Sequence, residues 1–184
     1  MTIVVVACAV VLCLVVQRRR AQLLAAHLPA YSVVLSMVGC GVETIGFRLS
    51  GSASSAALTV AMACLCGAAY GLRRWPGGWL LIAGIACNGL MMAIHGRMPI
   101  TPAVLQHVGI ASPAGTVLPG SKDIVAEGWL ATWGGDRFVT VVPFTDLTSV
   151  WSIGDVLLIA GVLRAVTGPV HGLALPCSSR RAAA

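Results

Sequence analysis

Carboxylates are the side chains best suited to chemistry in this chain. The sequence has six acidic residues, and four are candidates for acid/base catalysis: Glu43, Glu127, Asp136 and Asp155. A carboxylic acid that burial keeps protonated can donate a proton to an epoxide or an alkene near neutral pH. The candidate chemistry is therefore proton transfer to a poorly water-soluble molecule.

Aromatic side chains gather in the same part of the sequence. Four of them are expected to line a substrate cavity: Trp129, Trp133, Phe138 and Trp151. Aromatic faces attract a developing carbocation by about 2 kcal/mol or more when the site excludes water. Three polar residues from the preceding apolar run complete the expected substrate-binding set: Asn88, His95 and Arg97.

Asp155 also has a purely structural interpretation. The tetrapeptide Ser152-Ile-Gly-Asp155 opens an apolar run and fits a capping box, in which Ser152 and Asp155 bind each other's backbone amides. The negative charge also suits the positive end of a helix. A cap stabilises typically by about 1 kcal/mol. Capping and catalysis do not exclude each other, so both interpretations stay open.

The other candidates have structural alternatives too. Glu43 lies within an apolar run, where an ion pair with Arg48 or Arg97 would account for it. Asp136 follows two glycines, a common turn sequence, and Arg137 beside it offers a salt bridge. Glu127 is expected to share the solvated face of one helix with Asp123, and His95 has an interfacial interpretation.

The composition is that of an integral membrane protein. Of the 184 residues 58% are hydrophobic and 10% are charged, where a soluble domain has about 25% charged residues. The net charge of +6 comes from arginines in short clusters between apolar runs, which indicates membrane topology and no nucleic-acid partner. The expected partners are the lipid bilayer and a lipophilic small molecule. The oligomeric state stays open, a homo-oligomer included.

The predicted fold is an all-α membrane bundle that forms a single domain over residues 1–184. About five transmembrane helices are expected, at residues 2–16, 29–47, 54–72, 78–95 and 152–168. Arginines cluster on one side of these runs, at 18–20, 73–74 and 180–181. The positive-inside rule then puts the N-terminus outside and the C-terminus in the cytoplasm of a bacterial cytoplasmic membrane.

Residues 96–150 are too polar and too rich in proline to span a membrane. A loop of this length is uncommon unless it is functional or disordered, and its aromatic residues disfavour disorder. We expect a structured cap on the outer face. It should contain a turn of helix near residues 104–108, a second helix across 123–131, and an extended stretch at "RFVTVVPF".

Three stretches carry a resemblance to a known family: "CNGLMMAIHGRMPI", "KDIVAEGWLATWGGDRFVTVVPF" and "WSIGDVLLIAG". Together they resemble a family of small bacterial integral membrane proteins known only as a domain of unknown function. The matching positions include Arg97, Met98, Pro99, Asp136 and the Ser152–Asp155 segment. The resemblance implies a helical membrane fold and a membrane location, and it implies no activity.

Two functions from different classes follow. In size and character the chain is similar to small membrane-embedded bacterial terpene cyclases, which suggests a cyclase or isomerase acting on a lipophilic, terpene or epoxy-prenyl substrate. The alternative is a non-catalytic membrane accessory, sensor or assembly protein. No metal and no cofactor are expected, because the sequence lacks zinc-ligand spacing, HExxH, DDxxD and a phosphate-binding glycine loop.

Overall fold

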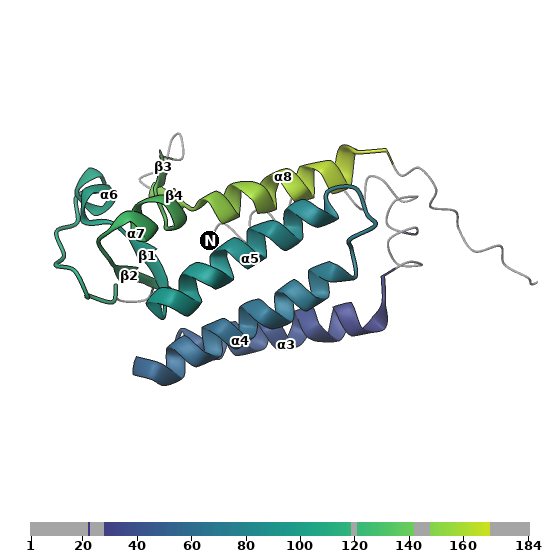
Figure 1. Cartoon of the computed structure of the whole chain (residues 1–184), viewed down its shortest axis with the longest axis horizontal. Coiled ribbons are helices and arrows are strands. Elements are labelled where there is room, and N and C mark those ends of the chain that lie inside the picture. The colour runs from purple at the N-terminus through teal and green to yellow at the C-terminus, as the bar shows by residue number, and fades with distance from the viewer. Residues whose placement is uncertain (1–21, 23–27, 119–120, 142–147, 170–184) are drawn as a thin grey trace, which may run out of the picture.

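Long helices form the body of the protein and a small mixed region caps one end (Figure 1). The computed structural model describes residue 22 and residues 28–118, 121–141 and 148–169. The expected span at residues 2–16 lies outside the described residues. The described long helices are α3 (Ala30–Gly46), α4 (Gly51–Tyr70), α5 (Gly78–His95) and α8 (Ile153–Thr167).

These helices lie where the sequence predicted the last four apolar segments, and the ends differ by at most three residues. In the described part of the chain, α4 and α5 are long and apolar enough to cross a membrane. Helix α3 is apolar but shorter, at 17 residues. Large apolar side chains remain exposed along the helices, such as Met37, Val60 and Leu90.

The described helices pack in a row, α3 on α4, α4 on α5, and α5 on α8. Glycines bring α5 and α8 together, because a Cβ added at Gly84 would lie 2.6 Å from the Gly154 carbonyl oxygen. A Cβ at Gly154 would overlap the side-chain oxygen of Asn88. The pair of glycines thus sets Asn88 directly against the first turn of α8.

The cap begins where α5 ends. Gly96 adopts the left-handed conformation (φ 79°) that closes helices, and strand β1 (Met98–Ile100) follows at once. Helix α6 (Pro102–His107) confirms the turn of helix expected near 104–108. It starts with a proline at its first position, and Thr101 Oγ1 accepts from the Val104 amide at 3.4 Å.

Two small sheets build the rest of the described cap, so the all-α expectation was incomplete there. Strand β2 (Asp123–Val125) pairs in parallel with β1, and β3 (Phe138–Val141) pairs antiparallel with β4 (Thr148–Trp151). The extended stretch is therefore confirmed over β3. The helix expected across 123–131 is wrong: α7 (Trp129–Gly134) starts only after Gly128, whose φ of 105° is not helical.

Two apolar clusters meet at β1. Met98 packs with Leu58 and Met62 of α4 and with Met91 and Met92 of α5. Two residues further, Ile100 packs with Leu105 and Val125 inside the cap. Strand β1 therefore anchors the cap to the helices, and the polar residues described next surround this joint.

Candidate functional site

Asp136 lies in the turn between α7 and β3, against the backbone of β1. Its amide donates to the Pro99 carbonyl at 2.8 Å, and it forms a bridge with Ile100. Gly135 makes this approach feasible, because a Cβ there would overlap the Pro99 carbonyl oxygen. The Asp136 residue is only 2% exposed, so its carboxyl lies in a medium that disfavours charge.

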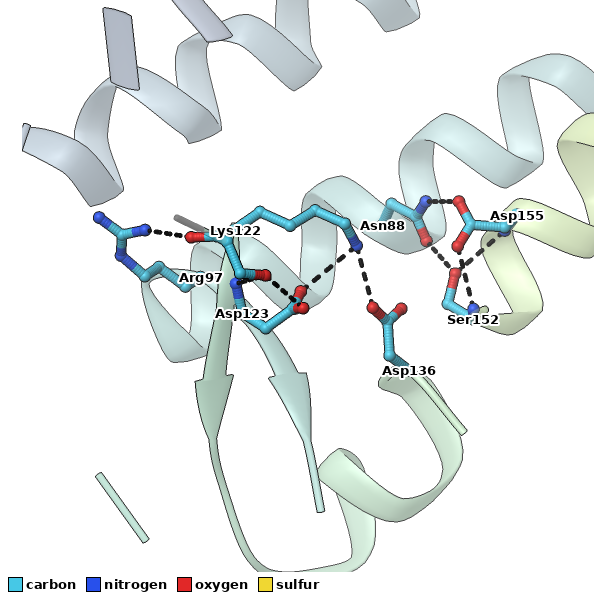
Figure 2. Close-up of polar contacts among 8 residues, drawn as sticks. Asn88, Arg97, Lys122, Asp123, Asp136, Ser152 and Asp155 are labelled. Carbon is cyan, nitrogen blue, oxygen red and sulfur yellow. Dashed lines mark hydrogen bonds and ion pairs between the residues drawn. The ribbon is translucent and has the colours of Figure 1, made fainter. Parts of the chain in front are cut away.

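Lys122 supplies the partner for this buried carboxyl. Its Nζ lies 3.1 Å from Asp136 Oδ2 and 3.6 Å from Asp123 Oδ1, as Figure 2 shows. Ser121 Oγ donates to Asp123 Oδ2 at 2.5 Å and so holds the second carboxylate in place. The remaining oxygen of Asp136, Oδ1, is buried without a hydrogen-bond partner among the described residues. One oxygen of the carboxyl is therefore paired with a cation, and the other is buried without a hydrogen-bond partner among the described residues.

Burial raises the pKa of Asp136 to about 7, and the nearby carboxylates of Asp123 and Asp155 add to the rise. Lys122 opposes it, both by charge and by its hydrogen bond. For Lys122 itself, burial works to lower the pKa, but Asp136, Asp123 and Asp155 together raise it above the ordinary lysine value. Asp136 consequently exchanges its proton near neutral pH beside a permanently charged ammonium group.

Asp155 takes part in a second, fully paired cluster at the start of α8. Ser152 Oγ accepts from the Asp155 amide at 3.0 Å, and Asp155 Oδ2 accepts from the Ser152 amide at 3.0 Å. These two bonds confirm the predicted capping box. Asn88 of α5 joins it, since its Nδ2 donates to Asp155 Oδ1 at 3.0 Å and its Oδ1 accepts from Ser152 Oγ at 2.8 Å.

Figure 2 places the two clusters side by side, with the Lys122 side chain extending toward Asn88 of α5. Asp155 acts on both Lys122 and Asp136 through its charge. Glu43 of α3 is half-buried, and Lys122 is the cation that attracts it. Three of the acidic residues that the sequence singled out, Glu43, Asp136 and Asp155, thus interact electrostatically with Lys122.

Hydrogen bonds within the protein occupy the guanidinium of Arg97, which indicates a structural role. The buried guanidinium donates to the Ser54 hydroxyl at 2.7 Å, to the Leu49 carbonyl at 3.1 Å and to the Ser121 carbonyl at 3.0 Å. It therefore ties the turn between α3 and α4 to the segment that carries Lys122. The alternative ion pair of Glu43 with Arg48 or Arg97 does not form in the described residues, whose ion pairs both involve Lys122.

The remaining expected residues lie away from the Lys122 cluster. Glu127 is exposed in the loop after β2, so it shares no helix face with Asp123. His95 Nδ1 lies 3.2 Å from the Met91 carbonyl, one turn back along α5. Neither residue contacts the Lys122 cluster through a hydrogen bond or ion pair in the described part of the chain.

The aromatic residues do not enclose a common space. Trp129 is 71% exposed and Trp133 is 54% exposed, both on α7, while Phe138 on β3 is also exposed. Arg137 does not form the expected salt bridge with Asp136; its guanidinium lies over the rings of Trp133 and Phe138. Trp151 is half-buried, and its Nε1 has no hydrogen-bond partner among the described residues.

Sequence reasoning missed Lys122 as a site residue. This lysine was not singled out from the sequence, and the neighbouring Asp123 was expected to lie on a helix face. The available signal was a charged pair, Lys122-Asp123, directly before the apolar residues Ile124 and Val125. That pattern fits a short buried strand as well as a helix, and nothing local reveals its pairing with β1.

Metal ligands do not cluster in the described residues, where no three His, Cys, Asp or Glu side chains lie close enough to hold an ion.

The comparisons with known proteins give a family and no activity. The model of a family of unknown function (DUF5317) matches residues 5–167. No curated protein matches the chain, and no solved structure does.

Proposed function

The chain belongs to this family of unknown function, and we propose its activity from the site itself. It is a membrane-embedded, metal-independent cyclase or isomerase that acts on a lipophilic substrate by proton transfer. Asp136 is the proton donor. Lys122 is the positioning residue that stabilises the carboxylate formed when the proton leaves.

One observation carries this proposal: the carboxyl of Asp136 is buried, has one oxygen without a partner, and has a pKa raised to about 7. An acid of this kind is protonated in a large fraction of molecules at neutral pH. It is also strong enough to give up the proton in a transition state. A structural carboxylate has no need for an unpaired oxygen, since a buried orphan acceptor costs about 1–3 kcal/mol.

The proposed reaction leaves no net change in protons. The O–H bond of neutral Asp136 breaks, and a new bond forms from that proton to an alkene carbon or an epoxide oxygen of the substrate. The Lys122 ammonium, 3.1 Å away, offsets the negative charge that remains. Loss of a proton from the rearranged cation to the Asp136 carboxylate then releases the product and restores the acid.

Trp151 is the aromatic residue that best fits a substrate contact. It is half-buried, and its carbonyl accepts from the Arg137 amide, next to Asp136, at 2.9 Å. Its unpaired Nε1 supplies a donor for an oxygen atom of the substrate. Trp133 and Phe138 fit a carbocation less well, because the cation over their rings is Arg137.

The proposed topology places the site at the outer surface of the bilayer. Helices α3, α4, α5 and α8 are the described spans, with the arginines at 73–74 in the cytoplasm and the cap outside. The apolar side chains exposed along these helices support contact with lipid. A lipophilic substrate would then reach Asp136 from the membrane rather than from water.

The test is a product assay with matched amide variants. Membranes that contain the wild type, Asp136→Asn, Asp155→Asn or Glu43→Gln are given linear and epoxidised prenyl substrates, and products are analysed by mass spectrometry and NMR. Loss of a general acid lowers the rate by about 10²- to 10⁴-fold, so Asp136→Asn should abolish the product at unchanged protein level. Asp155→Asn is the control, because its carboxylate is fully paired.

The proposal fails if product formation is the same in Asp136→Asn and in the wild type. If no substrate is converted by any variant, the non-catalytic function takes its place. One observation favours that second candidate: Trp129 and Trp133 expose large apolar faces from the short helix α7. Such faces suit contact with a membrane partner, which crosslinking from position 129 in intact membranes would detect.

A further inference from the structure

Arg137 and Asp136 are neighbours in the sequence, but their side chains contact different residues. Asp136 bridges to Ile100 and faces Lys122, whereas Arg137 continues into β3 and meets the rings of the exposed residues Trp133 and Phe138. The Arg137 environment is therefore separate from the proposed catalytic centre.

Two aromatic rings hold the Arg137 guanidinium. Its central carbon lies 4.5 Å from the centroid of Trp133 and 5.3 Å from that of Phe138. Contact of this kind restricts the guanidinium while its N–H groups stay available for hydrogen bonds. Within the described residues this guanidinium makes no ion pair and no hydrogen bond. A half-buried guanidinium without a counter-charge among the described residues is suited to an anion with two adjacent oxygens.

The position of α7 indicates where such an anion comes from. Helix α7 packs on the outer end of α5, and a Cβ at Gly134 would overlap Met91 of α5. Helix α5 is long and apolar enough to cross a membrane, so α7 lies near the level where such a helix leaves the bilayer. Exposed tryptophans are typical of that level, where lipid phosphates also lie.

We propose that Arg137, Trp133 and Phe138 form a binding site for the phosphate of an anionic phospholipid. The guanidinium edge donates to two phosphate oxygens while the tryptophan faces contact the glycerol and upper acyl region. The contacts that define this lipid site do not involve the Asp136 side chain, so the site does not depend on the proposed reaction.

The test is a lipid titration followed by native mass spectrometry on the full chain in detergent. Phosphatidylglycerol is the probe, and the Kd is compared for the wild type, Arg137→Gln, Arg137→Lys and Arg48→Gln. Arg48 is the matched control, an exposed arginine at the end of α3 with the same charge and no aromatic partner in the described residues. Arg137→Gln should raise the Kd about fivefold and Arg48→Gln should leave it unchanged.

The variant Arg137→Lys distinguishes recognition by the planar guanidinium from attraction by positive charge alone. Arg137→Lys keeps the charge and should still weaken binding, because an ammonium group cannot stack or donate in parallel. If Arg137→Gln melts at a lower temperature than the wild type, the Kd of Arg137→Lys is compared with that of the wild type instead. Equal effects of the Arg137 and Arg48 variants would overturn the proposal. So would displacement of the lipid by an equal concentration of inorganic phosphate, which would indicate a soluble ligand.

Discussion

Asp155 and Asp136 are two carboxyl groups at the same joint between helices and cap, yet their surroundings differ. Each oxygen of Asp155 accepts a hydrogen bond, one from Asn88 and one from the Ser152 amide. Asp136 has one oxygen on Lys122 and another with no partner in the described residues. A carboxylate whose two oxygens both accept hydrogen bonds is a structural group. A carboxyl with one unpartnered oxygen can still accept a hydrogen bond from a ligand.

The comparison predicts the largest loss of stability when Lys122 is removed. Lys122→Met leaves the buried Asp136 and the half-buried Asp123 without a cation, which should lower the free energy of unfolding by about 3 kcal/mol at pH 8. Unfolding in mixed detergent micelles measures the loss. The double variant Lys122→Met/Asp136→Asn should recover most of it. A double variant as unstable as the single one would show that Lys122 acts through packing rather than charge.

Gly154→Ala tests how tightly the Asp155 cluster is built. The added Cβ would overlap Asn88 Oδ1 and lie 2.8 Å from the Gly84 carbonyl, so we expect a loss of about 2 kcal/mol. Gly41→Ala is the control, since a Cβ there meets nothing within 4 Å and the helix gains alanine propensity. Thermal unfolding of the two variants side by side makes the comparison. Equal melting temperatures would contradict the close approach of α5 and α8.

Ser152→Ala removes the hydroxyl that joins the cap to Asn88. The lost cap and the unpaired Asn88 oxygen should together cost about 1–2 kcal/mol. Ser50 also precedes a helix, but its side chain makes no capping bond, so Ser50→Ala should change stability by less than about 0.5 kcal/mol. The same unfolding assay serves for both. Similar losses in both variants would mean that the hydrogen bonds of Ser152 contribute nothing.

The smallest expected effect is on how the melting temperature changes with pH. Asp136 has a pKa of about 7 in the folded chain, above the ordinary value of 3.8. The folded state then binds more protons than the unfolded state between these values, so this group makes stability fall as pH rises from about 4 to about 7. Asp136→Asn should flatten that part of the melting-temperature profile, while Asp155→Asn should reduce the slope only slightly, because its charge contributes less than burial to the pKa of Asp136. An unchanged slope in Asp136→Asn would refute the raised pKa.

Local signals predicted the helices and the Asp155 cap. The α5 segment begins after the left-handed Gly77 and ends at the left-handed Gly96, both visible as glycines that bound an apolar run. The capping box needs only four consecutive residues, so Ser152 and Asp155 were identified together with their bonds. Asn88, which was expected in the substrate-binding set, donates to Asp155 of α8.

Local sequence patterns could not predict the cluster of charged residues around Lys122. It forms because β2 pairs in parallel with β1, which aligns Asp123 with Met98 across a long intervening loop. Parallel pairing leaves no turn signal between its strands. Arg97 illustrates the same limit: its type suggested ligand binding, but Leu49 of the α3–α4 turn and Ser54 of α4 accept its hydrogen bonds. Residues that need partners from several segments are the ones whose roles the sequence could not predict.

The bond between Asn88 and Ser152 also has a consequence for synthesis. The two residues are 64 positions apart, and ribosomes add about 5–20 residues per second. Helix α5 must therefore wait roughly 3–13 s for α8 to supply the partners of the Asn88 side chain. During that interval the Asn88 side chain lacks its partners on α8. The contact between α5 and α8 is therefore completed only after Asp155 has been synthesised.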